Sequence, residues 1–371
     1  MSAKSTLHDI FEAADIKVNG DRPWDIKIHN EGFYTRVMGQ GTLGAGESYM
    51  DGWWDVEALD VFFTRLMGID IEKRLRSNPT VVFSVIKAMF LNLQRRSIYK
   101  VGEEHYDIGN DLYTKMLDKR LTYTCGYWKN AANLDEAQEH KLDLICRKLN
   151  LKKGDRVLDI GSGWGSFLNY AAEKYGAECV GITISKEQAA FANKNRGNLP
   201  VETRFQDYME VNEQFDHIVS IGMFEHVGKK NYRKFFEKSH TLLKDDGLFL
   251  LHTIGASKRS KGNGGDPWIS KYIFPYGELP SMDRVMIAVD KLYKTEDVHN
   301  FGHDYSHTLR AWRDNFEAGW PELKGKYDDR FYRMWMYYLN SFIAVFGVRN
   351  NHLWHFVFSK SGVKGGYTSV R

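Results

Sequence analysis

The rhythm of hydrophobic and polar positions changes near residue 134, and from there on it predicts alternating strands and helices. Short apolar runs that end in glycine or polar residues predict buried strands, whereas apolar residues three and four positions apart predict helices. Such an order is typical of an α/β fold, built on a doubly wound, mostly parallel sheet. We expect helices at 135–149 and 166–175, and strands at 156–160, 178–184, 201–205, 217–221, 248–252, 297–300 and 352–358.

The residues before 134 predict a smaller unit of mixed structure. Residues 24–28 alternate like a short strand, residues 39–46 suggest glycine-rich turns, and residues 58–66 suggest an amphipathic helix. Further along, the glycine-rich and aromatic stretch 256–281 predicts a long loop of the kind that often serves as a lid or binding element. We expect three parts: a small N-terminal domain over 1–75, a basic, apolar linker helix over 76–104, and a catalytic domain over 105–371.

The linker segment combines apolar and basic residues in an unusual way. Pro79 suits the first turn of a helix, and the residues up to 98 are apolar on nearly all sides and basic at both ends. The whole chain has a net charge of +3, whereas residues 71–100 carry seven basic residues against one acidic residue. Such a helix is either buried between two domains or helps the protein meet an acidic membrane surface.

Composition excludes several classes of protein. The chain has 371 residues, 43% hydrophobic and 27% charged, with 7 prolines, which is globular and neither disordered nor collagen-like. Its longest near-apolar stretch, 342–348, falls short of the roughly 20 residues that a membrane-spanning helix needs. The N-terminus shows no signal core or lipidation motif, so a cytoplasmic protein is expected. Its three cysteines, Cys125, Cys146 and Cys179, are too scattered for a disulfide framework or a metal site.

A glycine loop follows the first predicted strand of the sheet. Gly161, Gly163 and Gly165 come directly after Asp159, and glycines let a backbone turn tightly and approach a ligand near a helix N-terminus. Dinucleotide enzymes have the spacing G-x-G-x-x-G and an acidic residue about 20 positions further on. Here the spacing is G-x-G-x-G, the second strand ends in Thr183-Ile184-Ser185, and no basic cluster awaits a pyrophosphate. These features favour S-adenosylmethionine, which has a ribose and no phosphates.

The end of the third strand offers further cofactor contacts. Asp207 could accept a hydrogen bond from the adenine amino group, and Tyr208 could stack on the ring. Alternatively, Asp207 is an ordinary turn residue.

Two ionisable residues follow neighbouring strands. Glu225 comes after the strand 217–221, and His252 ends the strand 248–252. In open α/β sheets, ligands bind beyond the carboxyl ends of the strands. A histidine there is often only structural, but a carboxylate and an imidazole beside a cofactor loop predict a catalytic pair.

Seven motifs then make the chain recognisable. They resemble cyclopropane-fatty-acyl-phospholipid synthases, and they lie at 46–54, 105–111, 123–128, 157–165, 181–185, 222–228 and 251–255. The resemblance implies a Rossmann-like methyltransferase fold that uses S-adenosylmethionine. It also implies methylene transfer to the cis double bond of an unsaturated phospholipid acyl chain in a membrane bilayer. A homodimer, peripherally associated with the inner face of the membrane and with no nucleic-acid partner, is expected.

The resemblance also implies how the reaction proceeds. Attack of the alkene on the sulfonium methyl gives a carbocation, and a base must remove a proton from the new methyl so that the ring closes. Water would trap the cation, so the site must be dry. The base would be a bound bicarbonate, and Tyr106 would face the cation. The implied bicarbonate ligands are Cys125, Glu225, His252, the backbone of Ile254, and Tyr305.

Cofactor positions carry over from the matching motifs. The chain departs from some relatives in having Ser162 where a cysteine is common, and Phe342 where a C-terminal cysteine lies near the active site in some members. The second departure argues against an essential cysteine at that position. The implied cofactor residues are Tyr123, Thr124, Asp159, Gly161, Ser162, Gly163, Gly165, Thr183, Ile184, Ser185, Gln188, Asp207 and Tyr208.

Four other functions compete with ring formation. The same cation could yield a methyl branch, as in methylating relatives. A non-catalytic lipid-binding protein could have kept the fold, but intact Cys125, Glu225, His252 and Tyr305 argue against it. The strand ending at Ser185 disfavours a nicotinamide oxidoreductase. Nucleic-acid binding has only the basic segment in its favour.

Overall fold

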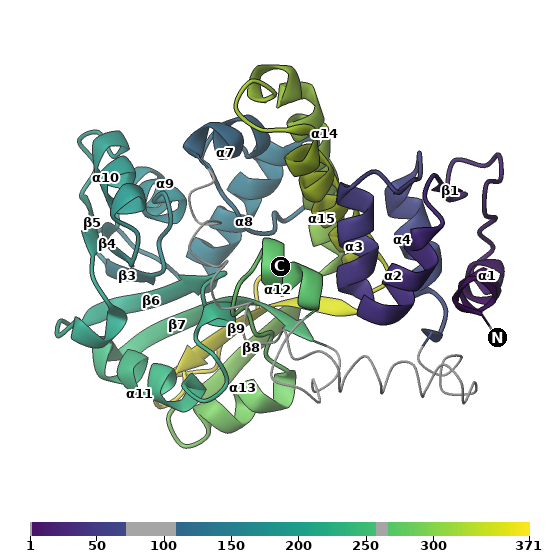
Figure 1. The fold of residues 1–371 in the computed structure, drawn as a ribbon. Helices are drawn as coiled ribbons and strands as arrows, with labels where there is room; N and C mark the ends of the chain where they lie inside the picture. The colour runs from purple at the N-terminus through teal and green to yellow at the C-terminus, as the bar shows by residue number, and fades with distance from the viewer. Residues whose placement is uncertain (1, 72–108, 257–265) are drawn as a thin grey trace. The chain divides into compact units, whose positions relative to one another are not determined.

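The computed structural model describes residues 2–71, 109–256 and 266–371, which group into two compact units (Figure 1). The predicted linker helix lies outside the described residues. The division into domains at residues 75 and 104 stays a prediction, although the unit that contains the N-terminal residues also includes segments from much later in the chain. The first unit comprises Met1–Met116, Gly262–Tyr276 and Leu309–Asn350, and the second comprises Leu117–Lys261, Gly277–Thr308 and Asn351–Arg371.

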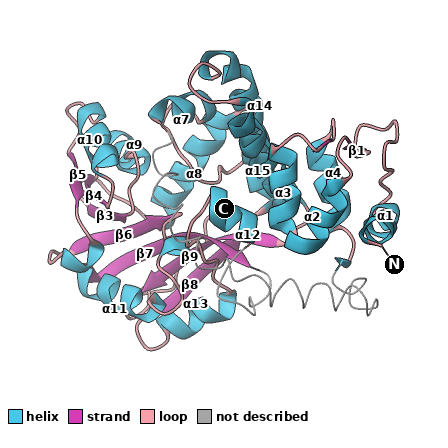
Figure 2. Cartoon of the chain, viewed as in Figure 1, coloured by secondary structure: helices cyan, strands magenta, loops and turns pink. Residues whose placement is uncertain are grey.

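The described part of the first unit is mainly helical (Figure 2). The strand predicted at 24–28 is present as the short strand β1 (Lys27–Ile28), which pairs with β2 (Trp54–Asp55). The amphipathic helix predicted at 58–66 is α4 (Leu59–Met67). The prediction of turns at 39–46 is wrong, because helices α2 and α3 occupy that stretch and only Gly41, at φ 60°, separates them. The remaining elements are α1 (Ala3–Ala13), α2 (Gly32–Gln40), α3 (Thr42–Met50), β2 (Trp54–Asp55), α4 (Leu59–Met67), α7 (Asn110–Met116), α12 (Pro267–Tyr272) and α15 (Asp329–Gly347).

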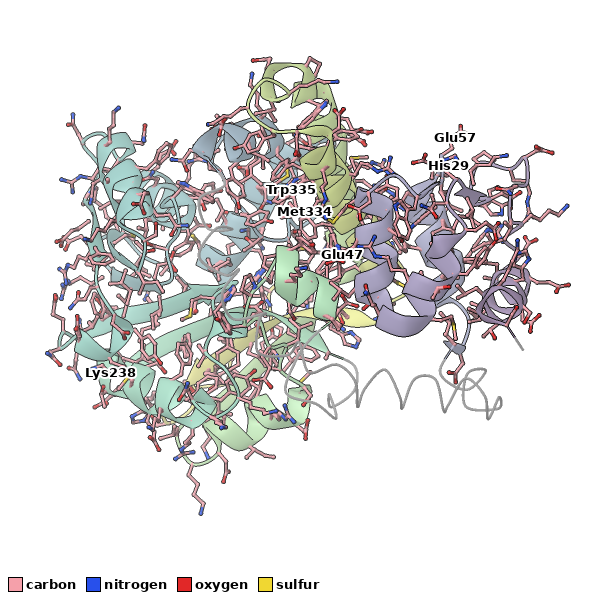
Figure 3. All side chains as sticks on the ribbon, viewed as in Figure 1. His29, Glu47, Glu57, Lys238, Met334 and Trp335 are labelled. Carbon is pink, nitrogen blue, oxygen red and sulfur yellow. The ribbon has the colours of Figure 1, made fainter. Side chains whose placement is uncertain are left out.

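Aromatic rings fill the core of this unit. The ring of Trp54 lies 5.4 Å from that of Phe62 and 6.4 Å from that of Tyr337, so α4 and α15 share one core. Glu47 on α3, labelled in Figure 3, accepts hydrogen bonds from Lys271 (2.6 Å) and Tyr272 (2.9 Å). Both donors belong to α12, so part of the stretch predicted as a loop at 256–281 is a packed helix.

The second unit contains the expected α/β sheet of seven strands, in the order β5-β4-β3-β6-β7-β9-β8 (Figures 1 and 2). The five strands from β5 to β7 are parallel, and β9 runs antiparallel to both β7 and β8. The mostly parallel sheet confirms the predicted fold class. Its strands are β3 (Arg156–Ile160), β4 (Glu178–Thr183), β5 (Val201–Phe205), β6 (Phe215–Ile221), β7 (Leu243–Ala256), β8 (Lys294–Asn300) and β9 (Asn351–Ser359).

Apolar side chains cover both faces of this sheet. On β3, Val157 belongs to the core under α8 and α9, whereas Leu158 and Ile160 belong to the core under α11 and α13. Alternate residues of a strand point to opposite faces, so a strand buried on both sides is apolar throughout. The helices are α8 (Leu134–Lys148), α9 (Ser166–Tyr175), α10 (Lys186–Asn195), α11 (Tyr232–Leu242), α13 (Met282–Val289) and α14 (His303–Leu323), whose first residues belong to this unit. Within the described ranges, no helix is apolar over a length that could cross a bilayer.

A buried ion pair fixes α8 against the edge strand β8. Lys148 on α8 donates to Asp297 on β8 at 2.9 Å, and their side chains are 0% and 4% exposed. Burial alone would raise the pKa of Asp297, but hydrogen bonds from Arg371 and Lys148 outweigh it and hold that pKa well below its usual range. Burial lowers the pKa of Lys148 to about 8, against the pull of Asp297. The pair is therefore ionised at neutral pH.

We predict that Asp297→Asn lowers the free energy of unfolding by about 3 kcal/mol, because it leaves the buried Lys148 without its counter-charge. Asp245→Asn is the matched control: Asp245 pairs with Lys360 but is 99% exposed, so its loss should cost less than about 1 kcal/mol. Denaturant unfolding of both variants measures the difference. Equal effects would contradict a structural role for the buried pair.

Candidate active site

The glycine loop that follows β3 is bound to the end of β4. Gly161 has a φ of 89°, a conformation that L-residues with a side chain rarely adopt, and a Cβ there would lie 2.6 Å from Met223. The N–H groups of Gly161 and Ser162 both donate to the carbonyl of Ile182, each at 3.0 Å. Gly163 and Gly165 also have positive φ, and α9 begins directly after them. The loop thus presents its backbone at the N-terminus of α9, as a nucleoside-binding turn requires.

Two ionisable groups are buried near this loop. Asp159 is 2% exposed, and its Oδ1 has no hydrogen-bond partner among the described residues. Burial raises the pKa of Asp159 to about 7, against the pull of Lys141. Lys141 on α8 is fully buried and donates to Oγ1 of Thr124 at 2.8 Å, and burial lowers its pKa to about 8. An unpaired carboxylate oxygen here fits a polar ligand such as a ribose.

Lys141 was not among the residues that we predicted from the sequence. The signal that could have found it is its position on α8, where Gln138, Lys141, Leu142 and Ile145 are all buried. A polar residue within the buried stripe of an amphipathic helix needs a polar partner. Here the partner is Thr124, whose backbone oxygen also accepts from Gln138 at 2.7 Å.

The corner after β4 is held by its own polar residues. The Thr183 hydroxyl donates to Gln188 at 2.8 Å, and the Ser185 hydroxyl accepts from the Gln188 amide at 3.2 Å, which caps α10. Between them the side chain of Ile184 is 81% exposed. A large apolar side chain held outward next to the glycine loop is suited to contact a ligand's flat ring.

The two residues that follow β5 give less support to a cofactor site. Asp207 is exposed, and one of its oxygens accepts from the Met209 amide at 2.8 Å, so it caps a short 3₁₀ turn as the alternative interpretation requires. Tyr208 is half-buried, with its ring 5.5 Å from that of Phe235. Their cofactor roles stay predictions.

Glu225 and the end of β7 lie together, as their strand positions suggested. Gly222 donates to the backbone oxygen of His252 at 2.9 Å, and Glu225 Oε1 accepts from the Ile254 amide at 2.6 Å. The second oxygen, Oε2, is buried and has no partner in the described part of the chain. Burial raises the pKa of Glu225 to about 7, so at neutral pH much of it carries a proton. The Ile254 N–H is therefore engaged by Glu225, and a role for the Ile254 backbone as an ion ligand stays a prediction.

His252 is 1% exposed and pairs with another histidine. Its Nδ1 lies 2.8 Å from Nε2 of His355, the residue directly opposite on β9. Burial, with the nearby Lys141, places the pKa of His252 well below its ordinary value, so its ring is neutral. The sequence did not identify His355, because only the register of β7 and β9 brings the two rings together.

Cys125 and Tyr305 are associated with the first turn of α14. The Thr308 hydroxyl accepts from the Gly126 amide at 3.0 Å, and Asp304 accepts from the Trp128 amide at 2.7 Å. Cys125 is fully buried and its thiol donates to the oxygen of Gly126. Burial, reinforced by Asp304, raises the pKa of Cys125 well above its ordinary value, so it is a protonated donor rather than a thiolate nucleophile.

The remaining predicted residues are less closely tied to this cluster. Tyr305 is buried in the same helical turn, and Tyr123 is half-buried. Ring contacts link the Cys125 segment to β7, because Phe301 lies 5.3 Å from Tyr127 and 6.2 Å from His252. Tyr106 lies outside the described residues, so its role stays a prediction. The Cys125 thiol, the Glu225 carboxyl and the His252 imidazole are each buried, and burial shifts the pKa of each toward its neutral form. That they act together in one site stays a prediction.

Comparison with known proteins identifies the family. The model of the mycolic acid cyclopropane synthetase family matches residues 93–356. The chain is 46% identical to the cyclopropane-fatty-acyl-phospholipid synthase of Escherichia coli (strain K12), over 98% of this chain and 95% of that protein. A probable fatty acid methyltransferase of Mycobacterium tuberculosis is 35% identical, over 70% of this chain and 62% of its own length.

Solved structures agree with the sequence comparison. The mycolic acid cyclopropane synthase CmaA1, complexed with SAH and CTAB, superimposes with a TM-score of 0.64 and is 33% identical, covering 69% of this chain and 96% of its own. The matched residues make up most of the chain, and the glycine loop, Glu225 and His252 all lie within them. The chain therefore belongs to the mycolic acid cyclopropane synthetase family and is an S-adenosylmethionine-dependent methyltransferase.

Proposed function

We propose that this enzyme transfers a methylene group from S-adenosylmethionine to the cis double bond of an unsaturated phospholipid acyl chain and forms a cyclopropane ring. The observation that carries the proposal is the extent of the similarity to the E. coli cyclopropane-fatty-acyl-phospholipid synthase, 98% of the chain. The structure of the mycolic acid cyclopropane synthase CmaA1, by contrast, covers 69% of this chain. The resemblance therefore extends over the N-terminal residues, which favours a phospholipid over a mycolic acid as substrate.

The cofactor site is formed by the loops beyond β3, β4 and β5. The glycine loop would hold the ribose and the amino-acid portion, with Asp159 and Thr124 beneath, and Ile184 would cover the adenine. S-adenosylmethionine supplies an electrophilic methyl group. The chain's own contribution is to orient that methyl and exclude water, because the alkene is a weak nucleophile and the cation that it forms must survive until a proton is lost.

Cys125, Glu225, His252, the backbone of Ile254 and Tyr305 would hold a bicarbonate ion, which would supply the base for this proton. Support comes from the donors present: the Cys125 thiol, which donates to the oxygen of Gly126 in this structure, is protonated, and Glu225, whose pKa burial raises to about 7, has an unpaired buried oxygen that can carry the proton. A neutral acid can donate to an anion that a carboxylate would repel. The Ile254 amide also orients Glu225, to which it donates at 2.6 Å.

The lipid must reach this site from a bilayer. The seven basic residues of 71–100 support peripheral association with an anionic membrane face, since each contributes about 1 kcal/mol of attraction near such a surface. This part of the proposal rests on the sequence, because those residues lie almost entirely outside the described part of the chain. A homodimer, which the family resemblance implies, is part of the same proposal.

The main competing product is a methyl branch, as the similarity to a probable fatty acid methyltransferase suggests. The deciding experiment incubates the enzyme with methyl-labelled S-adenosylmethionine and vesicles of unsaturated phospholipid, then examines the lipid by NMR. We expect the label in a cyclopropane methylene, with faster turnover on anionic than on neutral vesicles at low salt. Label in a methyl branch would overturn ring formation, and unlabelled lipid would overturn the substrate class.

We predict that Glu225→Gln lowers turnover by about 10²–10³-fold while the dissociation constant of the cofactor stays unchanged. An amide can still donate a hydrogen bond to the ion, but it cannot accept or release a proton. Glu237→Gln is the control, because Glu237 lies on α11 and its carboxylate pairs with Arg233 at the surface. Calorimetry with S-adenosylmethionine and a turnover assay on vesicles measure both quantities. Normal turnover in Glu225→Gln would remove this residue from the mechanism.

We predict that Cys125→Ser retains more activity than Cys125→Ala, because a hydroxyl can still donate to the ion and a methyl cannot. Cys146→Ser, at another buried cysteine, should not alter the bicarbonate response. In enzyme freed of carbon dioxide, added bicarbonate should raise the rate of the wild type. A rate that ignores bicarbonate would show that another group, such as Glu225, is the base. Equal inactivity of the two Cys125 variants would argue against a donor role.

A further inference from the structure

Three histidines lie side by side across the antiparallel strands at one edge of the sheet. His355 on β9 is directly opposite His252 on β7 and His299 on β8. His252 and His355 are joined by the 2.8 Å contact between Nδ1 and Nε2, and both rings are buried. His299 is in contact by its ring only, 6.4 Å from His355 and nearly perpendicular to it. The row thus begins at the candidate active site and continues away from it.

The contact between His252 and His355 requires one ring to donate and the other to accept. If His252 donated, His355 would have to carry its proton on Nδ1, and that atom is buried without a partner among the described residues. If His355 donates from Nε2, its Nδ1 is left with only a lone pair. A buried N–H without an acceptor is rarer and costlier than an under-used acceptor. The second arrangement instead places the N–H on Nε2 of His252, which is not among the fully buried atoms that lack a partner in the described residues, so the second arrangement is favoured.

We propose that His355 is a positioning residue that donates from its Nε2 to Nδ1 of His252 and thereby fixes the proton of His252 on Nε2. His252 then offers a neutral N–H from the side of its ring opposite His355. In the described ranges the side chain of His252 bonds to His355 through Nδ1, so Nε2 is the nitrogen left for a ligand. The chemical class that it suits is a small oxyanion, which needs donors.

The surroundings of His355 keep this pair neutral. Its ring is fully buried, and four groups raise the cost of a positive charge there: His252 on β7, Lys148 and Lys141 on α8, and His299 on β8. Burial and these groups hold the pKa of His355 well below its ordinary value. The pair is thus unsuited to store an extra proton, and suited to hold one tautomer.

This inference rests on the proposed function, because the oxyanion in question is the proposed bicarbonate. A neutral His252 donor, with a Glu225 whose pKa burial raises to about 7, would hold that ion through hydrogen bonds, so the ion keeps its basicity for the proton of the methyl group. If His252 instead offered a lone pair, it would lose one donor to the oxygens of the ion. His355 thereby sets how tightly the ion is bound.

The direct test is nitrogen-15 NMR of the wild-type enzyme labelled on histidine, which shows which ring nitrogen carries each proton and needs no activity. The variants His355→Leu and His355→Gln, which both lack the His355 ring, locate the signals in the spectrum. We expect the protons of His252 and His355 on Nε2. A proton on Nδ1 of His252 would overturn the proposal, whatever the enzyme's activity.

The kinetic test uses the same two variants. His355→Leu removes the donor, so the apparent affinity for bicarbonate should fall about tenfold or more, with an unchanged dissociation constant for S-adenosylmethionine. His355→Gln keeps an N–H donor and should recover most of that affinity. His217→Gln is the control, since His217 is a largely buried histidine on β6 whose Nδ1 accepts from the Leu248 amide instead.

The two variants also separate tautomer control from proton transfer. If His355→Gln loses as much bicarbonate affinity as His355→Leu, both imidazole nitrogens of His355 are needed, and the tautomer proposal is overturned. If bicarbonate affinity is the same in all variants, it is overturned as well. A wild type that ignores bicarbonate but shows the proton of His252 on Nε2 would instead count against the proposed base alone.

Discussion

Burial of polar groups in and after the last residues of the parallel strands, near their carboxyl ends, is the constraint on which the candidate site depends. Asp159, Glu225 and His252 are each at most 6% exposed, and burial disfavours the charged form of each. Unpaired buried polar atoms are rare in proteins because they cost free energy. Here Asp159 and Glu225 each keep one oxygen without a partner in the described part of the chain, so the site is preorganised at some cost to stability. A ligand that satisfied them would recover that cost.

The central strand β3 could be predicted with its bounds, because it is buried on both faces and an apolar run ended by glycine leaves little choice of structure. The edge strand β5 also has the predicted bounds, 201–205, although Glu202 and Phe205 are exposed. The turns predicted at 39–46 failed for a physical reason. The glycines of α3 are there for close packing: a Cβ on Gly44 would meet a backbone oxygen of Arg36 at 2.4 Å, and one on Gly46 would meet Trp268 at 2.3 Å.

The candidate site likewise contains residues that could be predicted from the sequence and residues that could not. That Glu225 lies beside β7 could be predicted from the sequence, because neighbouring parallel strands end at the same edge of the sheet. β7 runs on past His252 to Ala256, and the Glu225 carboxylate bonds to the Ile254 amide. Lys141 and His355 could not be predicted, because one depends on how α8 packs and the other on the register between β7 and β9. Asp207 shows the opposite case, in which a residue suited to a ligand also serves as the cap of a short turn.

Burial shifts the groups of this site toward their neutral forms, and this follows from their buried positions rather than from any single residue type. A charged carboxylate or an imidazolium beside an anionic base would either repel it or neutralise its basicity, whereas neutral donors bind it and leave its lone pairs reactive. The Cys125 thiol, the Glu225 acid and the His252 ring all have pKa values moved toward the neutral form by the same desolvation. Because a carbocation reacts with any water present, the dryness that protects the intermediate also sets the protonation states of the groups around it. One physical cause thus serves both requirements of the proposed chemistry.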